Sequence, residues 1–173
     1  MPILKKKQGI LLVISGPAGS GKTTLCERLV GAYSPGLSRV ITSTTREPRP
    51  GETNGIDYHF FSDAEFVTKM GEGAFYEHAV VHQKRYGVLK SEVQCKLDAG
   101  VDLILNVDVQ GAAAFRQVAT EDLSLGDSLT SLILIPSDID VIRQRLEGRG
   151  TDDMEEINRR LHVAEQEISR WRE

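Results

Sequence analysis

The sequence has little cysteine, no large net charge and no apolar run long enough to cross a bilayer. Its 173 residues include 2 Cys, Cys26 and Cys95, without Cys-x-x-Cys spacing, which is typical of reduced thiols in a cytoplasmic protein. The apolar run at 9–14 follows a lysine cluster, as in a signal peptide, but it is short and leads into a glycine-rich loop. We therefore interpret it as a buried strand and expect no membrane-spanning segment.

The balance of charge excludes one broad class of partner. A net charge of −4 disfavours a general nucleic-acid binder, and a chain of 173 residues is expected to form one domain. Arginines are nevertheless concentrated in 39–49 and 143–172. A local excess of cations within an acidic protein favours a small anionic ligand over a long polyanion.

Apolar runs alternate with helical spacing along the chain, and this alternation predicts an α/β fold with a mostly parallel sheet. We expect buried strands at 10–15, 101–108 and 129–135. We expect helices at 23–33, 90–99 and 110–119, and from 138 to 171 with a glycine break at 148–151. A further helix is expected after Ser62, with Glu65 completing a capping box.

Residues 16–23 match the phosphate-loop pattern G-x-x-x-x-G-K-[ST] in full, between a predicted strand and a predicted helix. The glycines allow successive backbone amides to face an anion at the helix N-terminus. We expect Lys22 to bridge the β- and γ-phosphates of ATP and the Thr23 hydroxyl to bind Mg²⁺. The expected ATP-binding residues are Gly16, Pro17, Ala18, Gly19, Ser20, Gly21, Lys22, Thr23 and Thr24.

An acid, Asp108, stands at the end of the second predicted strand. The carboxyl end of that strand is expected beside the phosphate loop, so Asp108 would reach Mg²⁺ directly or through water. Residues 108–111 also match the D-x-x-G pattern of GTPases. No N-K-x-D occurs in the chain, so guanine recognition in the GTPase manner is not expected.

Two groups of arginines suit transfer of a phosphoryl group between two nucleotides. Such a reaction needs several cations, because the donor and acceptor phosphates repel each other. Arg46 and Arg49 lie on a proline-containing segment, and the second group is Arg143, Arg145, Arg149, Arg159 and Arg160. The glycine break inside the second group suits a hinged lid that excludes water. The alternative for each late arginine is a solvated, charged helix face.

The blocks GPAGSGKTT, TSTTREPRPGETNGIDYHFFS, FYEHA, RYG, LNVDVQG, RLEGRG and INRRL, in this order, resemble guanylate kinase, a P-loop nucleoside monophosphate kinase family. The resemblance covers nearly the whole chain. It implies a three-layer P-loop NTPase core at 8–38 and 90–142, a GMP-binding subregion at about 39–89 and a helical lid at about 143–160. It also implies Mg²⁺-dependent transfer of the γ-phosphoryl group of ATP to GMP, in purine nucleotide metabolism.

The resemblance also implies roles for individual residues. The catalytic residues would be Lys22, Arg46, Asp108, Arg149 and Arg160. The GMP-binding residues would be Thr42, Arg46, Arg49, Tyr58, Glu77, Tyr86, Asn106 and Asp108. Among them Glu77 would bind the guanine edge, because one carboxylate can accept from guanine N1–H and the 2-amino group together. No general base is required, because a nucleotide 5′-phosphate is already a nucleophile at neutral pH.

The sequence departs from the family pattern at three places. Val88 stands where a Ser or Thr is usual, which predicts weaker base discrimination, because valine cannot donate to guanine O6. Asn106 stands where an aspartate is usual, so Asp108 is expected to carry more of the anionic role. The sequence ends at Glu173, in the helix after the lid, where the family continues through one more strand and helix.

Two alternative functions remain at this point. One is a non-catalytic guanylate-kinase-like module that binds a phosphorylated peptide, although such modules usually have a degraded phosphate loop. The other is a kinase for another nucleoside monophosphate, which Val88 makes conceivable. The choice between GMP and dGMP, the oligomeric state and any protein partner cannot be derived from the residues.

Overall fold

The protein, in a computed structural model, is described for residues 8–81, 83–148 and 153–169, and it is built on two separate sheets. The core sheet is parallel, with strand order β2-β7-β1-β8. Its strands are β1 (Leu11–Ser15), β2 (Leu37–Arg39), β7 (Asp102–Asn106) and β8 (Leu129–Ile133). The expected parallel α/β fold is therefore confirmed.

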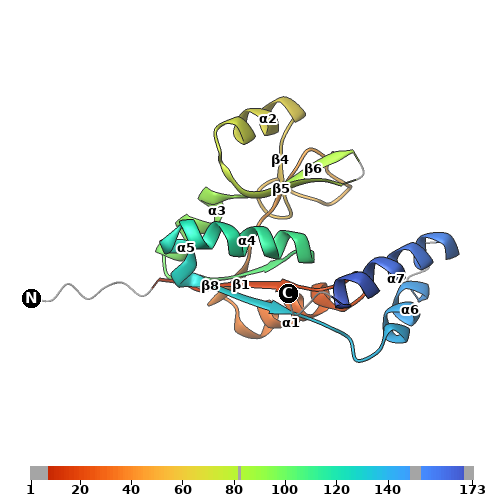
Figure 1. The fold of residues 1–173 in the computed structure, drawn as a ribbon. Coiled ribbons are helices and arrows are strands. Elements are labelled where there is room, and N and C mark those ends of the chain that lie inside the picture. The colour runs from red at the N-terminus through yellow and green to blue at the C-terminus, as the bar shows by residue number, and fades with distance from the viewer. Residues whose placement is uncertain (1–7, 82, 149–152, 170–173) are drawn as a thin grey trace, which may run out of the picture.

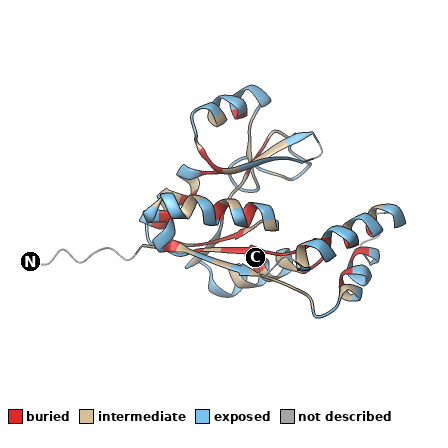
Figure 2. Cartoon of the chain, in the orientation of Figure 1, coloured by how far each residue is buried: buried red, intermediate tan, exposed pale blue. Residues whose placement is uncertain are grey.

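Helices cover both faces of the core sheet, because its central strands are apolar on both sides. Leu11, Val13 and Leu105 pack in a buried cluster with residues of α3 (Lys90–Asp98), α4 (Val109–Glu121) and α5 (Leu123–Ser128). Ile14 and Ile104 point the other way and pack with α1 (Lys22–Tyr33). Figure 1 shows α4 and α1 on opposite sides of β1, and Figure 2 shows β1 itself as buried.

The second sheet stands away from the core on the side of α4 (Figure 1). Its strand order is β4-β3-β6-β5, formed by β3 (Ser43–Thr44), β4 (His59–Phe60), β5 (Phe75–Val81) and β6 (Lys84–Leu89). Helix α2 (Asp63–Gly71) covers it, packing Phe66 against Phe75 and Leu89. The predicted capping box is confirmed: the Ser62 hydroxyl accepts from the Glu65 amide, and the Glu65 carboxylate accepts from the Ser62 amide.

Two further helices, α6 (Ile139–Glu147) and α7 (Met154–Ser169), form a pair beyond the carboxyl ends of β1 and β8 (Figure 1). The pair has its own small apolar core, which includes Ile142, Leu146 and Leu161. None of the helices in the described part of the chain is both long enough and apolar enough to cross a membrane.

The antiparallel hairpin β5–β6 has a strained turn. Gln83 has φ 63°, in the left-handed region, where an L residue with a Cβ atom is disfavoured.

We predict that Gln83→Gly raises the free energy of unfolding by about 0.5–1 kcal/mol, because glycine removes the Cβ clash but adds unfolded-state entropy. Urea unfolding followed by circular dichroism measures the change. Gln83→Ala is the matched control and gains nothing, because it keeps the Cβ atom. Equal midpoints for the Gly and Ala variants would contradict the assignment of strain to this turn.

Candidate functional site

The phosphate-loop sequence connects β1 to α1 at the carboxyl end of the central strand. Gly16 has φ 138°, and a Cβ atom there would lie 2.3 Å from the Leu134 carbonyl oxygen. Gly21, the N-cap of α1, has φ 102°. Both positions therefore require glycine, and they turn the loop so that it meets the N-terminus of α1, where backbone amides favour an anion.

Lys22 and Arg145 both donate hydrogen bonds to backbone carbonyls of this loop. Lys22 Nζ donates to the Gly16 carbonyl at 2.6 Å and to the Pro17 carbonyl at 2.9 Å. Arg145, on α6, donates from Nη1 to the carbonyls of Gly19 at 3.2 Å and Ser20 at 2.8 Å. The loop carbonyls thus accept from cationic side chains, which helps to keep the loop amides available to an anion.

Asn106 is the last residue of β7, Asp108 follows two positions later, and the two residues make different local contacts. Asn106 Nδ2 donates to Thr23 Oγ1 at 3.2 Å, so Asn106 is tied directly to the phosphate loop. Asp108 is the N-cap of α4, and its Oδ1 accepts from the Gly111 amide at 2.7 Å. The structure therefore places Asn106 against the residue expected to bind Mg²⁺, whereas Asp108 has one carboxylate oxygen engaged in the helix cap.

A cavity of about 480 Å³, here called the inter-sheet cavity, separates the core sheet from the second sheet. It brings together most of the residues expected to contact GMP. Its lining comprises Thr23, Arg39, Val40, Thr42, Tyr58, Glu77, Ala79, Val81, Tyr86, Gly87, Val88, Leu105, Asn106, Val107 and Asp108. Burial, and then the nearby charge of Asp108, raise the pKa of Glu77 above its usual value.

A second cavity of about 370 Å³, here called the phosphate-loop cavity, lies between the loop and α7. Its lining comprises Gly16, Ala18, Lys22, Val81, Asp108, Arg159, Arg160, Val163 and Glu167. Burial and the charge of Asp108 raise the pKa of Glu167, while Lys22 opposes the rise. Val81 and Asp108 line both cavities, so the cavities meet at these residues.

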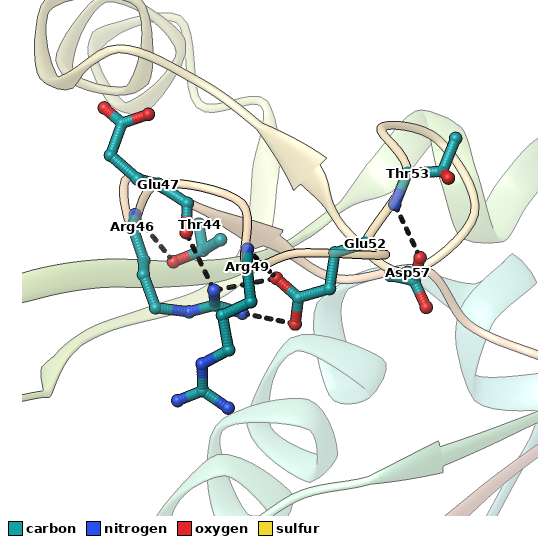
Figure 3. Close-up of polar contacts among 7 residues, drawn as sticks. All are labelled: Thr44, Arg46, Glu47, Arg49, Glu52, Thr53 and Asp57. Carbon is teal, nitrogen blue, oxygen red and sulfur yellow. Dashed lines mark hydrogen bonds and ion pairs between the residues drawn. The ribbon is translucent and has the colours of Figure 1, made fainter.

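The loop after β3 holds Arg46 in a fixed position (Figure 3). Its guanidinium makes a two-point contact with Glu52, with Nη1–Oε2 at 2.8 Å and Nη2–Oε1 at 3.0 Å. The guanidinium carbon also lies 5.2 Å from the ring centroid of Tyr58, which lines the inter-sheet cavity. Arg46 is thus adjacent to the cavity wall without belonging to the lining.

Arg49 is positioned through its backbone. Its amide donates to Glu52 Oε2 at 2.7 Å, and its guanidinium extends away from that carboxylate (Figure 3). The hydrogen bond from Arg46, and then that from the Arg49 amide, lower the pKa of Glu52 to about 2. The Glu52 carboxylate therefore orients both the Arg46 side chain and the Arg49 backbone.

The late arginines share another carboxylate on α7. Arg159 donates to both oxygens of Glu156, each at 2.7 Å, and Arg160 Nε donates to Oε1 at 2.7 Å. Hydrogen bonds from Arg159 and then Arg160 lower the pKa of Glu156 to about 2. Arg149, expected beside them, lies outside the described residues.

The described residues offer few ligands for a metal ion. Within the described ranges, no group of three or more His, Cys, Asp or Glu could hold one. Thr23 and Asp108 nevertheless line the same cavity, and Mg²⁺ commonly takes one or two protein ligands together with substrate phosphates and waters. These residues fit an ion that arrives with a nucleotide.

Comparison with known proteins decides the family. A family model described as guanylate kinase matches residues 8–173. The chain belongs to the guanylate kinase family. The guanylate kinase of Ruegeria sp. (strain TM1040) is 40% identical over 166 residues, covering 96% of this chain and 74% of the relative. That of Chromohalobacter salexigens is 40% identical over 173 residues, covering 100% of this chain and 77% of the relative.

The structural comparison agrees with the sequence. A crystal structure of guanylate kinase from Anaplasma phagocytophilum matches with a TM-score of 0.63 and 28% identity, over 95% of this chain and 73% of that chain. The P-loop NTPase fold expected from the guanylate kinase resemblance is thereby confirmed.

Sequence patterns did not identify several residues that lie in or beside the two cavities and the phosphate loop. Glu52 lies inside the block TSTTREPRPGETNGIDYHFFS, and its spacing of three residues from Arg49 is the signal that could have identified it. Arg145 was grouped with the lid arginines, but it contacts the phosphate loop. Val81, Val163 and Glu167 carry no motif, and only the folded chain brings them to the phosphate-loop cavity.

We predict that the Glu52 carboxyl titrates near pH 2 and that in Arg46→Gln its pKa returns toward the ordinary 4.5. Because the folded-state pKa is lowered, the stabilisation from this pair is present above about pH 4.5 and is lost as the pH falls toward 2. Carboxyl-detected NMR titration measures both proteins. Arg49→Gln is the control that leaves the pKa low, because Arg49 contributes chiefly through its backbone amide. A wild-type pKa near 4.5 would contradict the contact.

Proposed function

We propose that the protein transfers the γ-phosphoryl group of ATP to GMP, giving ADP and GDP. The observation that carries this proposal is the meeting of the two cavities at Val81 and Asp108. One cavity borders an intact phosphate loop, and the other contains a partly buried carboxylate, Glu77, suited to guanine. Two nucleotides placed in them would direct their phosphates toward each other.

On the donor side, we assign the triphosphate to the phosphate-loop cavity. The loop amides and Lys22 would bind the β- and γ-phosphates, and Arg160 faces the same cavity from α7. A divalent cation, which we propose is Mg²⁺, would be held by Thr23 and, directly or through water, by Asp108. When bound, it neutralises charge on the phosphates.

On the acceptor side, we assign GMP to the inter-sheet cavity. Glu77 would accept from N1–H and the 2-amino group of guanine, while Tyr58, Tyr86 and Thr42 face the same space. Arg46 and Arg49 would bind the phosphate. Val88 is 2% exposed and presents only methyl groups, which supports the expectation of weaker base discrimination. The proposal includes dGMP as a second candidate acceptor.

The chemistry follows from positioning and charge. A phosphate oxygen of GMP attacks the γ-phosphorus, the bond to the β-phosphate oxygen breaks, and ADP leaves with that electron pair. Lys22, Arg46 and Arg160 would stabilise the negative charge on the transferring group. The GMP phosphate is already deprotonated near pH 7, so the reaction needs no general base.

We further propose that the molecule closes during the reaction. Arg46 borders the inter-sheet cavity but is not part of its lining, so the second sheet, which lies within the proposed GMP-binding subregion at about 39–89, must approach the core to bring this arginine to the phosphates. The α6–α7 pair, which overlaps the proposed lid at 143–160, would close further over the phosphate-loop cavity, which Arg160 already lines. A cytoplasmic location, where ATP and GMP are available, is part of this proposal.

The alternative of a non-catalytic peptide-binding module is not favoured. Gly16 and Gly21 keep the backbone angles of the loop, and Lys22 reaches the loop carbonyls. A module that binds only a phosphorylated peptide would not require this donor site.

Initial rates with ATP–Mg²⁺ and each of GMP, dGMP, IMP, AMP and UMP test the proposal. A coupled assay of ADP formation, checked by chromatography of the product, is expected to show GDP formation fastest with GMP or dGMP. Lys22→Ala is the background control and is expected to lower kcat by at least about 100-fold. A faster rate with AMP would overturn the acceptor assignment, and no transfer to any acceptor would overturn the kinase proposal.

The pKa of Glu77 is raised. As the pH falls, GMP binding is therefore expected to weaken at a higher pH than it would if Glu77 had the ordinary pKa of a glutamate. The carboxylate form binds guanine, so binding is present above this pKa and is lost as the pH falls through it. We predict that Glu77→Gln raises the KM for GMP about 10- to 100-fold and removes this part of the pH dependence.

The phosphate of GMP also titrates in acid, with a second pKa of about 6. Its titration affects the wild type and the variant alike, so the ratio of wild-type to variant KM is compared at each pH. A ratio that does not change with pH would contradict the role given to Glu77.

A further inference from the structure

Two exposed valines face the phosphate-loop cavity from different parts of the molecule. Val81, at the end of β5, is 45% exposed, and Val163, on α7, is 41% exposed. Exposed valines are common on protein surfaces and need no explanation singly. These two line one cavity whose other side chains are mostly charged, and one of the two stands where that cavity meets the inter-sheet cavity.

The geometry of β5 sets the place of Val81. Alternate residues of the strand, Glu77, Ala79 and Val81, line the inter-sheet cavity, as the two-residue period of a strand requires. Glu77 and Val81 are separated by about 13 Å along the strand, at about 3.3 Å per residue. One face of the strand thus runs from the group assigned to guanine to the junction with the phosphate-loop cavity.

With GMP bound as proposed, water would compete with it at this junction. In hydrolysis a water oxygen attacks the γ-phosphorus, giving ADP and inorganic phosphate and releasing a proton, without forming GDP. The charged side chains of the cavity, Lys22, Asp108 and Arg160, bind water well. A valine side chain offers water no hydrogen bond, so an apolar wall at the junction disfavours a water in line with the γ-phosphorus.

We propose that Val81 and Val163 form an apolar seal over the transfer site when the units that carry them close, and that this seal favours transfer to GMP over hydrolysis of ATP. The proposal rests on the proposed function. Both residues are positioning residues, since they exclude water and contact no reacting atom.

The test replaces each valine by threonine, which keeps the branched shape and adds a hydroxyl that can hold water. With ATP–Mg²⁺ and GMP, inorganic phosphate and GDP are measured in the same reaction. We expect Val81→Thr and Val163→Thr each to raise the ratio of phosphate to GDP about threefold to tenfold, the factor that one added hydrogen bond to water gives. In the double variant the ratio of phosphate to GDP is expected to be only slightly higher than in the more affected single variant, because one threonine already admits water to the site.

Two matched controls separate the seal from general effects of the substitution. Val80→Thr changes the neighbouring residue on the other face of β5, where the side chain is 63% exposed. Val67→Thr changes a residue of α2 that is 46% exposed, close to the exposure of Val81. Both are expected to keep the wild-type ratio. The ratio does not depend on the fraction of folded protein, and Lys22→Ala gives the background hydrolysis.

The outcomes distinguish this inference from the function on which it rests. If the wild type forms no GDP, the proposed function fails. If the wild type forms GDP and both seal variants keep its phosphate-to-GDP ratio, the seal is overturned while the kinase stands. A rise in the Val80→Thr or Val67→Thr control equal to that in the seal variants would also overturn it.

Discussion

The rest of the site depends on the anion cradle at the end of β1. The strand is buried between two helical layers, so the position of its carboxyl end is fixed by the core. The Leu134 carbonyl leaves room only for glycine at 16, and Arg145 holds the carbonyls of the loop from α6. A rigid loop of this kind binds phosphate without reorganising, which is the condition for strong electrostatic stabilisation of phosphoryl transfer.

Carboxylates orient the cations of the loop after β3 and of α7. Glu52 holds Arg46 and the Arg49 backbone, and Glu156 holds Arg159 and Arg160. Neither arrangement is strong evidence for stability, because these groups are at least partly exposed to solvent. Their value is geometric: an arginine already held in one orientation loses less freedom when it binds a phosphate. The cations are therefore arranged before a nucleotide arrives.

Local sequence signals predicted the elements that position the site. The apolar run of β1, the glycine pattern of the phosphate loop and the Ser62–Glu65 capping box are set by residues close in sequence, and all three are present in the structure. The β5–β6 hairpin was not predicted, because one face of β5 lines a cavity and its residues do not alternate cleanly. The contacts Asn106–Thr23 and Arg145–Ser20 join residues 83 and 125 positions apart, so no local pattern could reveal them.

We propose that Arg46 and Arg49 bring the phosphate of one nucleotide against a triphosphate held by Lys22. The decisive measurement is a crystal structure with adenosine and guanosine joined through five phosphates. We expect guanine at Glu77, the guanosine-side phosphate on Arg46 and Arg49, and the adenosine-side phosphates on the loop amides and Lys22. A complex in which the two arginines point away from the phosphates would contradict it.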